Sequence, residues 1–184
     1  ELAHFRSAVE RTLGDFAQGG EQVAAHVPKD VAGVFTVYEM LLQSRGFVEA
    51  VEKEIAAGNW APGALRAAVD EIARQFESVE DEYLRARGED IRHLGNRVYH
   101  HLREIEAPAA KDGEPIVLVG HLVSVTDIAA FPIKQLVGIV SVEGSALSHT
   151  AVLANALGIP AVMGVESIHG FEDGEQAIVD GYSG

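Results

Sequence analysis

The stretch GSALSHTAVLANALGIP, residues 144–160, decides the fold of the second half of the chain. It opens with small residues, continues as an apolar run, and closes with Gly158 and Pro160, which typically end helices. We therefore expect a helix over Ser148–Leu157 with Ser148 as its N-cap. β-branched runs lie on both sides of the stretch, so it predicts a small α/β unit.

His149 falls in the first turn of this expected helix, where backbone N–H groups without helical partners and the helix dipole favour anions. The same field keeps an imidazole neutral and nucleophilic near pH 7. A phosphoryl group on His149 would lie beside these donors and the hydroxyls of Ser148 and Thr150. Gly144 and Ser145 would let the backbone approach it closely. The pattern predicts a covalent phosphoryl carrier.

The residues leave other interpretations of this Ser-His-Thr open. A lone Ser-His-Thr also fits a histidine that only lies at the surface end of a helix and has no chemical role. A serine hydrolase is disfavoured because no G-x-S-x-G elbow is present and because adjacent helical residues face different directions. Metal binding is disfavoured because the remaining histidines show no H-E-x-x-H or comparable spacing.

Composition restricts the class of protein. The 184 residues carry 28 acidic and 14 basic side chains, a net charge of −14, which disfavours nucleic acid and favours a basic protein surface as partner. The absence of cysteine excludes disulfides and thiolate chemistry. No apolar run reaches the roughly 20 residues of a membrane span, so we expect a cytoplasmic protein. Because the sequence starts at Glu1 without methionine, we expect a piece of a longer protein.

Apolar periodicity changes along the chain. Residues 1–105 show helical spacing throughout, and the sequence AQGGEQ at 17–22 is expected to loosen or end the first helix. Further helices are expected over 31–42, 47–57 and 64–105, with Gly88 and Gly95 as possible breaks in the last. After a boundary near 106–114, short β-branched runs predict strands at 116–119, 137–142, 161–165 and 177–179.

Three segments in order resemble enzyme I of the phosphoenolpyruvate-dependent phosphotransferase system. EGSALSHTAVLANALGIPAVMGV at 143–165 is similar to its phosphohistidine signature, and VEDEYLRARGEDIRHLGNRVYHHL at 79–102 to its long helix. VFTVYEMLLQSRGFVEAVEKEI at 34–55 resembles the preceding helical hairpin. Phosphoenolpyruvate synthase and pyruvate phosphate dikinase carry related signatures but lack the long-helix segment. The details of the hairpin and loop look closer to the nitrogen-regulatory paralogue.

The resemblance implies an all-α helical carrier-binding domain over 1–105 and an α/β phosphohistidine (swivelling) domain over 106–184, whose first strands would precede residue 1. In this family the histidine, here His149, takes phosphate from phosphoenolpyruvate and passes it to a histidine of an HPr-like, here nitrogen-type, phosphocarrier. A C-terminal barrel, absent here, holds phosphoenolpyruvate and Mg²⁺ and forms the homodimer. We therefore expect a monomer without a cofactor, whose helical half moves relative to its α/β half.

The resemblance also implies which residues meet the carrier: Tyr38, Met40, Leu41 and Phe47 on the hairpin, and Leu84 and Arg87 on the long helix. The apolar members fit ordinary core packing between helices equally well. A group of acidic residues could steer a basic carrier or form a solvated helix face: Glu80, Asp81, Glu82, Glu89 and Asp90.

Several positions depart from the family pattern. Ser145 and Leu147 replace a glycine and a threonine of the loop, and Asn155 replaces an arginine expected to help hold phosphate. Ile128 aligns with a threonine expected to orient the histidine ring, for which Thr126 or Ser124 could substitute. A second hypothesis therefore stays open, a non-catalytic helical interaction module whose phosphohistidine site has decayed.

Overall fold

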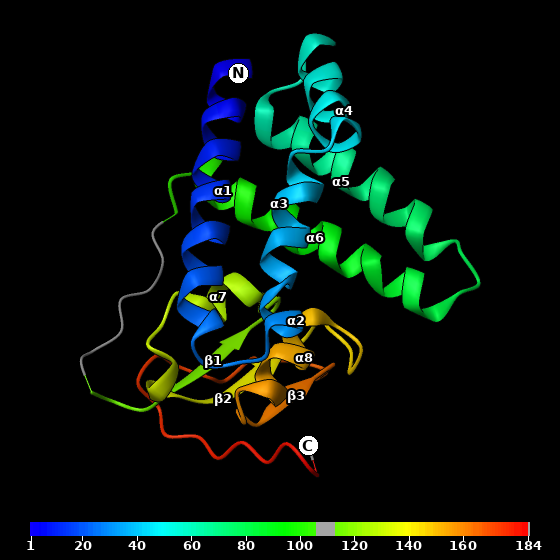
Figure 1. Ribbon diagram of the computed structural model, residues 1–184. Coiled ribbons are helices and arrows are strands. Elements are labelled where there is room, and N and C mark those ends of the chain that lie inside the picture. Colours follow the sequence, from blue (N-terminus) through cyan, green and yellow to red (C-terminus); the bar gives the residue numbers. More distant parts are fainter. Residues whose placement is uncertain (106–112, 184) are drawn as a thin grey trace. The chain divides into compact units, whose positions relative to one another are not determined.

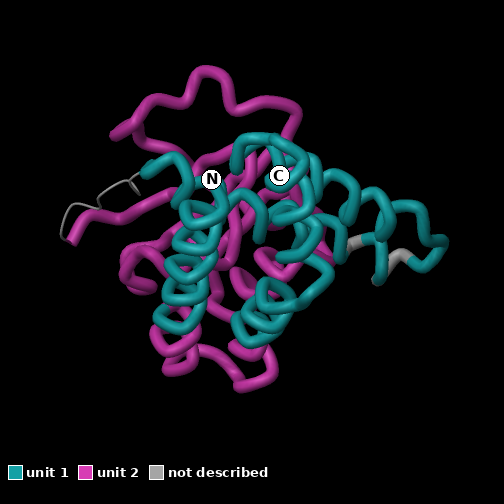
Figure 2. Tube along the Cα trace, turned by 90° about the horizontal axis from the view of Figure 1, so that it is seen from above, with its two compact units in different colours: residues 1–18, 34–107 teal, residues 19–33, 108–184 magenta. Residues whose placement is uncertain are grey.

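The computed structural model describes residues 1–105 and 113–183, without the side chains of Glu82, Tyr83 and Ala86. The chain forms two compact units, which Figure 2 distinguishes by colour. Unit 1 comprises residues 1–18 and 34–107, and unit 2 comprises residues 19–33 and 108–184. Most of the expected boundary at 106–114 lies outside the described residues.

The assignment of all residues up to 105 to one helical domain differs from this division in one segment. Residues 19–33 join unit 2, because the short helix α2 (Lys29–Ala32) packs against α8 (His149–Ala156) and Gln22 Nε2 donates to the carbonyl of Phe131 at 2.9 Å. The helix α1 (Leu2–Ala24) therefore supplies residues to both units.

Unit 1 consists of amphipathic helices: most of α1, together with α3 (Val34–Leu42), α4 (Arg45–Ala56), α5 (Ala61–Glu77) and α6 (Glu82–Leu102). The helices α5 and α6 pack along each other (Figure 1). The core of the unit consists of large side chains that recur at helical spacing: Phe5, Phe16, Phe35, Leu42, Leu65 and Leu94.

Two expectations about helix ends in residues 1–105 are wrong. The glycines at 19 and 20 do not end α1, because Phe16 and Val23 are both buried and lie on one helical face across them. The segment 64–105 is two helices rather than one. A turn at 78–81 separates them, where the Asp81 side chain accepts the N–H of Leu84 at 3.0 Å and so starts α6.

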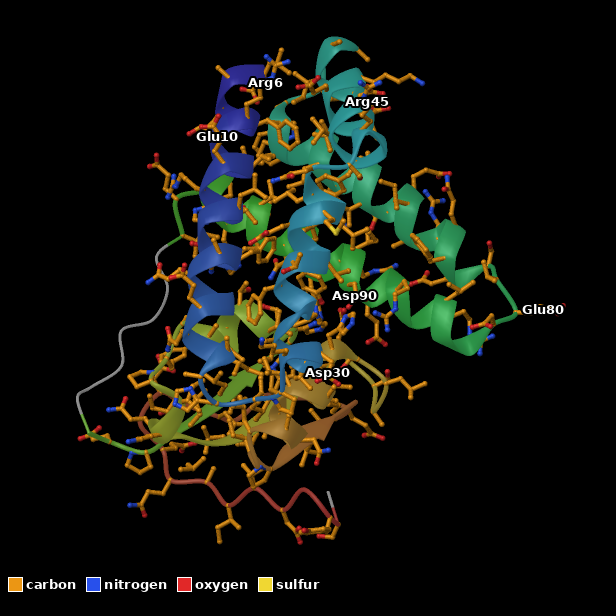
Figure 3. All side chains as sticks on the ribbon, viewed as in Figure 1. Arg6, Glu10, Asp30, Arg45, Glu80 and Asp90 are labelled. Carbon is orange, nitrogen blue, oxygen red and sulfur yellow. The ribbon has the colours of Figure 1, made fainter. Side chains whose placement is uncertain are left out.

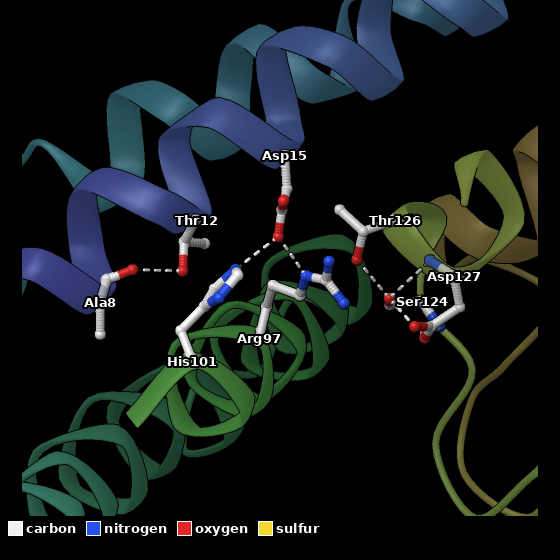
Figure 4. Close-up of polar contacts among 8 residues, drawn as sticks. All are labelled: Ala8, Thr12, Asp15, Arg97, His101, Ser124, Thr126 and Asp127. Atoms are coloured by element: carbon white, nitrogen blue, oxygen red, sulfur yellow. Dashed lines mark hydrogen bonds and ion pairs between the residues drawn. The ribbon is translucent and has the colours of Figure 1, made fainter. Parts of the chain in front are cut away.

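A carboxylate clip joins α1 to α6 inside unit 1. Asp15 Oδ2 lies 2.5 Å from Arg97 Nε and 2.6 Å from His101 Nε2 (Figure 4). The three side chains are largely buried, so the pairing is shielded from water and from salt. Thr12, one turn before Asp15, donates its hydroxyl to the carbonyl of Ala8 at 2.8 Å.

Unit 2 contains a parallel sheet in the order β1 (Ile116–Gly120), β2 (Leu136–Ser141), β3 (Ala161–Met163). The crossover from β1 to β2 carries α7 (Val125–Ala129) and a 3₁₀ turn (Ile133–Gln135), and the crossover from β2 to β3 is α8. Ile128, Ile139 and Leu153 are fully buried and form its core. The α/β class of this half and the all-α class of the other are confirmed.

The expected fourth strand at 177–179 is wrong, since the segment forms no strand in the structure. It contacts the sheet through a side chain instead. A Cβ placed on Gly138 of β2 would lie 2.7 Å from Cγ2 of Val179, so the missing side chain at Gly138 makes room for this valine. Apolar periodicity does not predict α7 (Val125–Ala129), because its five residues are too few to give a periodic signal.

Among the helices of the described residues, none combines the length and the apolar character that a membrane span requires.

Candidate functional site

His149 is the first residue of α8, as the sequence predicts. Ser148 precedes it in an extended conformation, and its Oγ accepts the N–H of Ala151 at 3.2 Å, which makes it the N-cap. The backbone N–H of Ser148 donates to the carbonyl of Ser145 at 3.1 Å, which tightens the loop before the helix. The His149 side chain is half-buried.

The loops that follow all three strands are joined at Ser141, the buried last residue of β2. Its carbonyl accepts the N–H of Gly164 at 2.9 Å, and its hydroxyl accepts the N–H of Val123 at 3.2 Å. Thr150 Oγ1 in turn donates to the carbonyl of Val123 at 3.1 Å and fixes the first turn of α8. His149 therefore lies at the carboxyl edge of a parallel sheet, where α/β proteins bind ligands.

Gly144 has a positive φ of 116°, which favours glycine, and an added Cβ would lie 3.4 Å from Sδ of Met163. The glycine therefore makes the turn out of β2 and leaves room for Met163. Ser145 is half-buried and contributes its carbonyl to the loop, whereas Leu147 is exposed. The proposed approach of Gly144 and Ser145 to a ligand stays a prediction.

An anion has natural donors at this helix start. Ser148 accepts the N–H of Ala151, and an α-helix supplies no acceptor of its own for the N–H groups of its first turn, to which Thr150 belongs. Backbone donors of this turn and the positive end of α8 would stabilise the oxygens of a phosphoryl group on the imidazole. The backbone therefore offers the charge stabilisation that a phosphohistidine requires.

The hydroxyls next to His149 have structural partners. The Thr150 hydroxyl donates its single proton to the carbonyl of Val123, so its oxygen can only accept in this structure, and its expected role beside the phosphate stays a prediction. Ser148 is buried and serves as the N-cap, and its expected role beside the phosphate stays a prediction.

Replacing Ser148 by alanine should lower the free energy of unfolding by about 1 kcal/mol, because α8 loses its cap. The variant should still accept phosphate on His149. The matched control is Ser44→Ala, which removes the corresponding cap of α4, where Ser44 Oγ accepts the N–H of Phe47 at 3.4 Å. Thermal unfolding and phosphate incorporation measure the two properties separately. Loss of phosphate in a folded Ser148→Ala chain would show a catalytic role for the hydroxyl.

The positions that depart from the family pattern have clear structural roles. Ile128 is fully buried in the core of unit 2, and Ser124 caps α7 in a reciprocal capping box with Asp127. Ser124 Oγ lies 2.7 Å from Asp127 Oδ2 and 2.8 Å from Thr126 Oγ1 (Figure 4). An ionised carboxylate only accepts, so Ser124 donates to Asp127 and Thr126 donates to Ser124. Thr126 can therefore accept a ring N–H but has no proton to offer.

Asn155 is exposed near the C-terminal end of α8. Its side chain carries no charge, so it cannot replace the cation that the family pattern has at this position.

The residues expected to meet a carrier divide into exposed and buried ones. Met40 on α3 and Leu84 on α6 are 68% and 41% exposed, and Leu41 is half-buried. Tyr38 and Phe47 are only 1% and 3% exposed, so the expectation that they touch a partner is wrong. Their rings fill the core of unit 1, where Tyr38 meets Phe16 edge-on at a centroid distance of 5.6 Å.

Val37 is a further exposed apolar residue of α3, three residues before Met40, and was not among the residues expected to meet a carrier. Helical periodicity could have found it, because Tyr38 and Leu42 lie on the buried face and Val37 and Met40 lie off that face.

The acidic residues do not form one uniform face. Glu80 lies exposed in the turn between α5 and α6 (Figure 3). Asp81 is the N-cap of α6. Asp90 is buried, with its Oδ2 2.9 Å from Arg87 Nη1. Glu89 is half-buried, and the side chain of Glu82 lies outside the described residues. Only part of the predicted group can therefore steer a carrier.

Within residues 1–105 and 113–183, no group of three or more histidine, aspartate or glutamate side chains is arranged as metal ligands would be.

Comparison with known families covers nearly the whole chain. Residues 1–87 match the model of the N-terminal domain of PEP-utilising enzymes, and residues 112–184 match the model of their mobile domain. A solved N-terminal domain of the nitrogen enzyme I superposes with a TM-score of 0.65 at 32% identity, over 91% of this chain and 68% of that one. The chain belongs to the enzyme I family.

A second solved structure, an enzyme I domain in solution, superposes with a TM-score of 0.71 at 31% identity, over 89% of this chain and 67% of that one. Among curated relatives, a phosphoenolpyruvate-dependent phosphotransferase system protein of Escherichia coli is 33% identical over the whole chain. A phosphoenolpyruvate-protein phosphotransferase of Staphylococcus aureus is 28% identical. The chain spans 25% and 33% of the length of these two relatives.

Proposed function

We propose that this chain exchanges a phosphoryl group between His149 and a histidine of an HPr-like phosphocarrier of the nitrogen branch. The observation that carries the proposal is the position of His149, in the first turn of α8 at the carboxyl edge of the sheet. Membership of the enzyme I family supports it. Unit 2 supplies the phosphohistidine, and the helices of unit 1 supply the surface for the carrier.

The transfer step needs little chemistry from the protein beyond position and charge stabilisation. A lone pair on an imidazole nitrogen of His149 attacks phosphorus as the N–P bond on the carrier histidine breaks. Each imidazole keeps the proton on its other ring nitrogen, so the exchange has no net proton change. The N–H groups at the start of α8 face the phosphoryl oxygens throughout.

The other parts of the family reaction are assigned to protein outside residues 1–184. There we place the phosphoenolpyruvate site, Mg²⁺ as its metal, and the dimer contact. On its own the present chain acts as a monomer, and the intact protein acts in the cytoplasm.

One set of observations favours the alternative, an interaction module with a decayed phosphohistidine site. The protons of the Thr150 and Thr126 hydroxyls are donated within the fold, and Asn155 is uncharged. Both hypotheses need the docking surface, but only the first needs phosphate on His149.

Replacing Met40 or Leu84 by aspartate should reduce the rate of phosphate transfer from phosphorylated HPr at limiting concentration by about tenfold, because each change places a charge in an apolar contact. Transfer from phosphoramidate, a small donor that needs no docking, should stay unchanged. The control Ile178→Asp alters an exposed apolar residue of unit 2 and should change neither rate. Equal losses with both donors would contradict the docking assignment.

A further inference from the structure

Ser141 ends β2, and it is the one polar residue in the sequence LVGIVS of that strand. Its side chain is completely buried. Taking a hydroxyl out of water costs free energy unless it forms hydrogen bonds inside the protein. Ser141 Oγ accepts the N–H of Val123 at 3.2 Å and donates to the carbonyl of His121 at 3.5 Å. The serine therefore holds the loop after β1 at two backbone groups.

The same loop is attached to the helix that carries His149. The carbonyl of Val123 accepts the Thr150 hydroxyl at 3.1 Å, and the Thr150 side chain is buried as well. Side chains from β2 and from α8 thus hold the N–H and the carbonyl of Val123. Because Thr150 directly follows His149, two hydroxyls and one loop residue connect the sheet to the first turn of α8.

Backbone bonds attach only the start of this loop to the segment after β2. The carbonyls of Gly120 and His121 accept the N–H groups of the two residues that follow Ser141, at 3.2 and 2.8 Å. Val123 lies two residues beyond His121, and the Ser141 hydroxyl extends the attachment to it. The hydroxyl therefore fixes the residue whose carbonyl Thr150 contacts.

The position of the first turn of α8 matters for phosphoryl transfer, because the imidazole must approach phosphorus in line with the bond that breaks. A displacement of about 1 Å can lower the rate of such a reaction by about 100-fold. The N-cap on Ser148 orders this turn but belongs to the same segment, so it does not attach the turn to the sheet. The bonds of Ser141 and Thr150 to Val123 make that attachment.

We propose that Ser141 is a positioning residue, whose hydroxyl acts through Val123 and Thr150 to hold His149 in place for phosphoryl transfer. The inference rests on the proposed function, because it assigns a role in the transfer at His149. It requires no contact of Ser141 with the phosphate or the carrier, and every residue involved belongs to unit 2.

The test compares the rate of phosphate incorporation from phosphoramidate with the rate from phosphorylated HPr at saturating concentration. We expect Ser141→Ala to lower both rates by about tenfold, since the loop loses its attachment to β2. Thr150→Val should lower them by a similar factor, whereas Thr150→Ser keeps the hydroxyl and should retain most of the rate. The double variant Ser141→Ala/Thr150→Val should lose little more than either single variant, because both hydroxyls act through Val123.

Ile139→Val is the matched control for a loss of stability in unit 2. Ile139 is fully buried and lies on the same face of β2 as Ser141. The change removes one methylene from the core and destabilises the sheet, but it leaves every hydrogen bond in place. Its transfer rates should equal those of the unmodified chain. The Kd of Ser141→Ala for HPr should also be unchanged, because docking is assigned to unit 1.

Amide hydrogen exchange reports on the first turn of α8 without any phosphate. The N–H of Val152 donates to the carbonyl of Ser148 at 3.1 Å, which is the bond that begins the helix. At equal free energy of unfolding, we expect this N–H to exchange faster in Ser141→Ala and in Thr150→Val than in Ile139→Val. Thr150→Val serves for both measurements if Ser141→Ala does not fold.

The outcomes distinguish the positioning role from the proposed function. If the unmodified chain takes phosphate from neither donor, the proposed function fails and the positioning role fails with it. If it takes phosphate but Ser141→Ala is no slower than Ile139→Val, only the positioning role is overturned. Additive losses in the double variant, or an unchanged exchange of the Val152 N–H, also overturn only the positioning role.

Discussion

Replacing Gly95 by alanine should destabilise the chain, although alanine is the better helix former by about 1 kcal/mol. An added Cβ at this position on α6 would lie 2.4 Å from Cγ2 and 3.1 Å from Cγ1 of Val69 on α5. Valine has a stiff branched side chain inside a tight crossing, so the backbones must separate. Overpacking of this kind costs about 1–3 kcal/mol, and we expect a net loss of about 1 kcal/mol.

Two further variants make this result specific to the crossing. Gly14→Ala on α1 meets no atom within 4 Å, so it should stabilise the chain by the helix propensity alone. Val69→Ala should cost less in the Gly95→Ala background than in the unmodified chain, because it removes the clash. Denaturant unfolding measures all four free energies. A stabilised Gly95→Ala chain would contradict the close packing of α5 on α6.

Replacing His149 by alanine should abolish phosphate incorporation, because no other side chain at the start of α8 supplies a nucleophilic nitrogen. The fold should change little, since the cap on Ser148 and the bond from Thr150 to Val123 do not involve the imidazole. We expect the free energy of unfolding to change by no more than about 1 kcal/mol. Intact mass and thermal unfolding give the two readouts.

His121→Ala is the matched control for this loss. His121 follows β1 at the same edge of the sheet, and its exposed Nδ1 lies 3.3 Å from Glu143 Oε1. If a position near this edge of the sheet were enough for a histidine to accept phosphate, His121 would accept it as well. Incorporation should persist in His121→Ala. Its disappearance there, or its persistence in His149→Ala, would assign the phosphate to another residue.

The site could be predicted where local sequence determines local structure. Ser148, the apolar run and Gly158 define α8 by rules that act within a few residues, and the structure places the helix within one residue of the expected bounds. The first three strands follow from β-branched runs in the same way.

What the sequence could not indicate depends on contacts between distant residues. The glycines at 19 and 20 lower the local helix propensity, yet α1 continues past them because Phe16 and Val23 on either side are buried. The residue type of Tyr38 does not distinguish a buried position from an exposed one. Its hydroxyl can be buried because Asp90, 52 residues later in the chain, accepts its hydrogen bond. The hydroxyls of Thr126 and Thr150 are likewise held by hydrogen-bond partners that the spacing of residues in the sequence does not identify.

The central claim is that His149 carries a phosphoryl group received from a carrier. Intact-protein mass spectrometry, at neutral to alkaline pH after mixing the chain with phosphorylated HPr, tests it most directly, with His149→Ala alongside. We predict one acid-labile phosphoryl group on the unmodified chain, lost again when excess unphosphorylated HPr is added, and none on the variant. A chain that binds HPr yet gains no phosphate would contradict the account and leave the interaction module as its function.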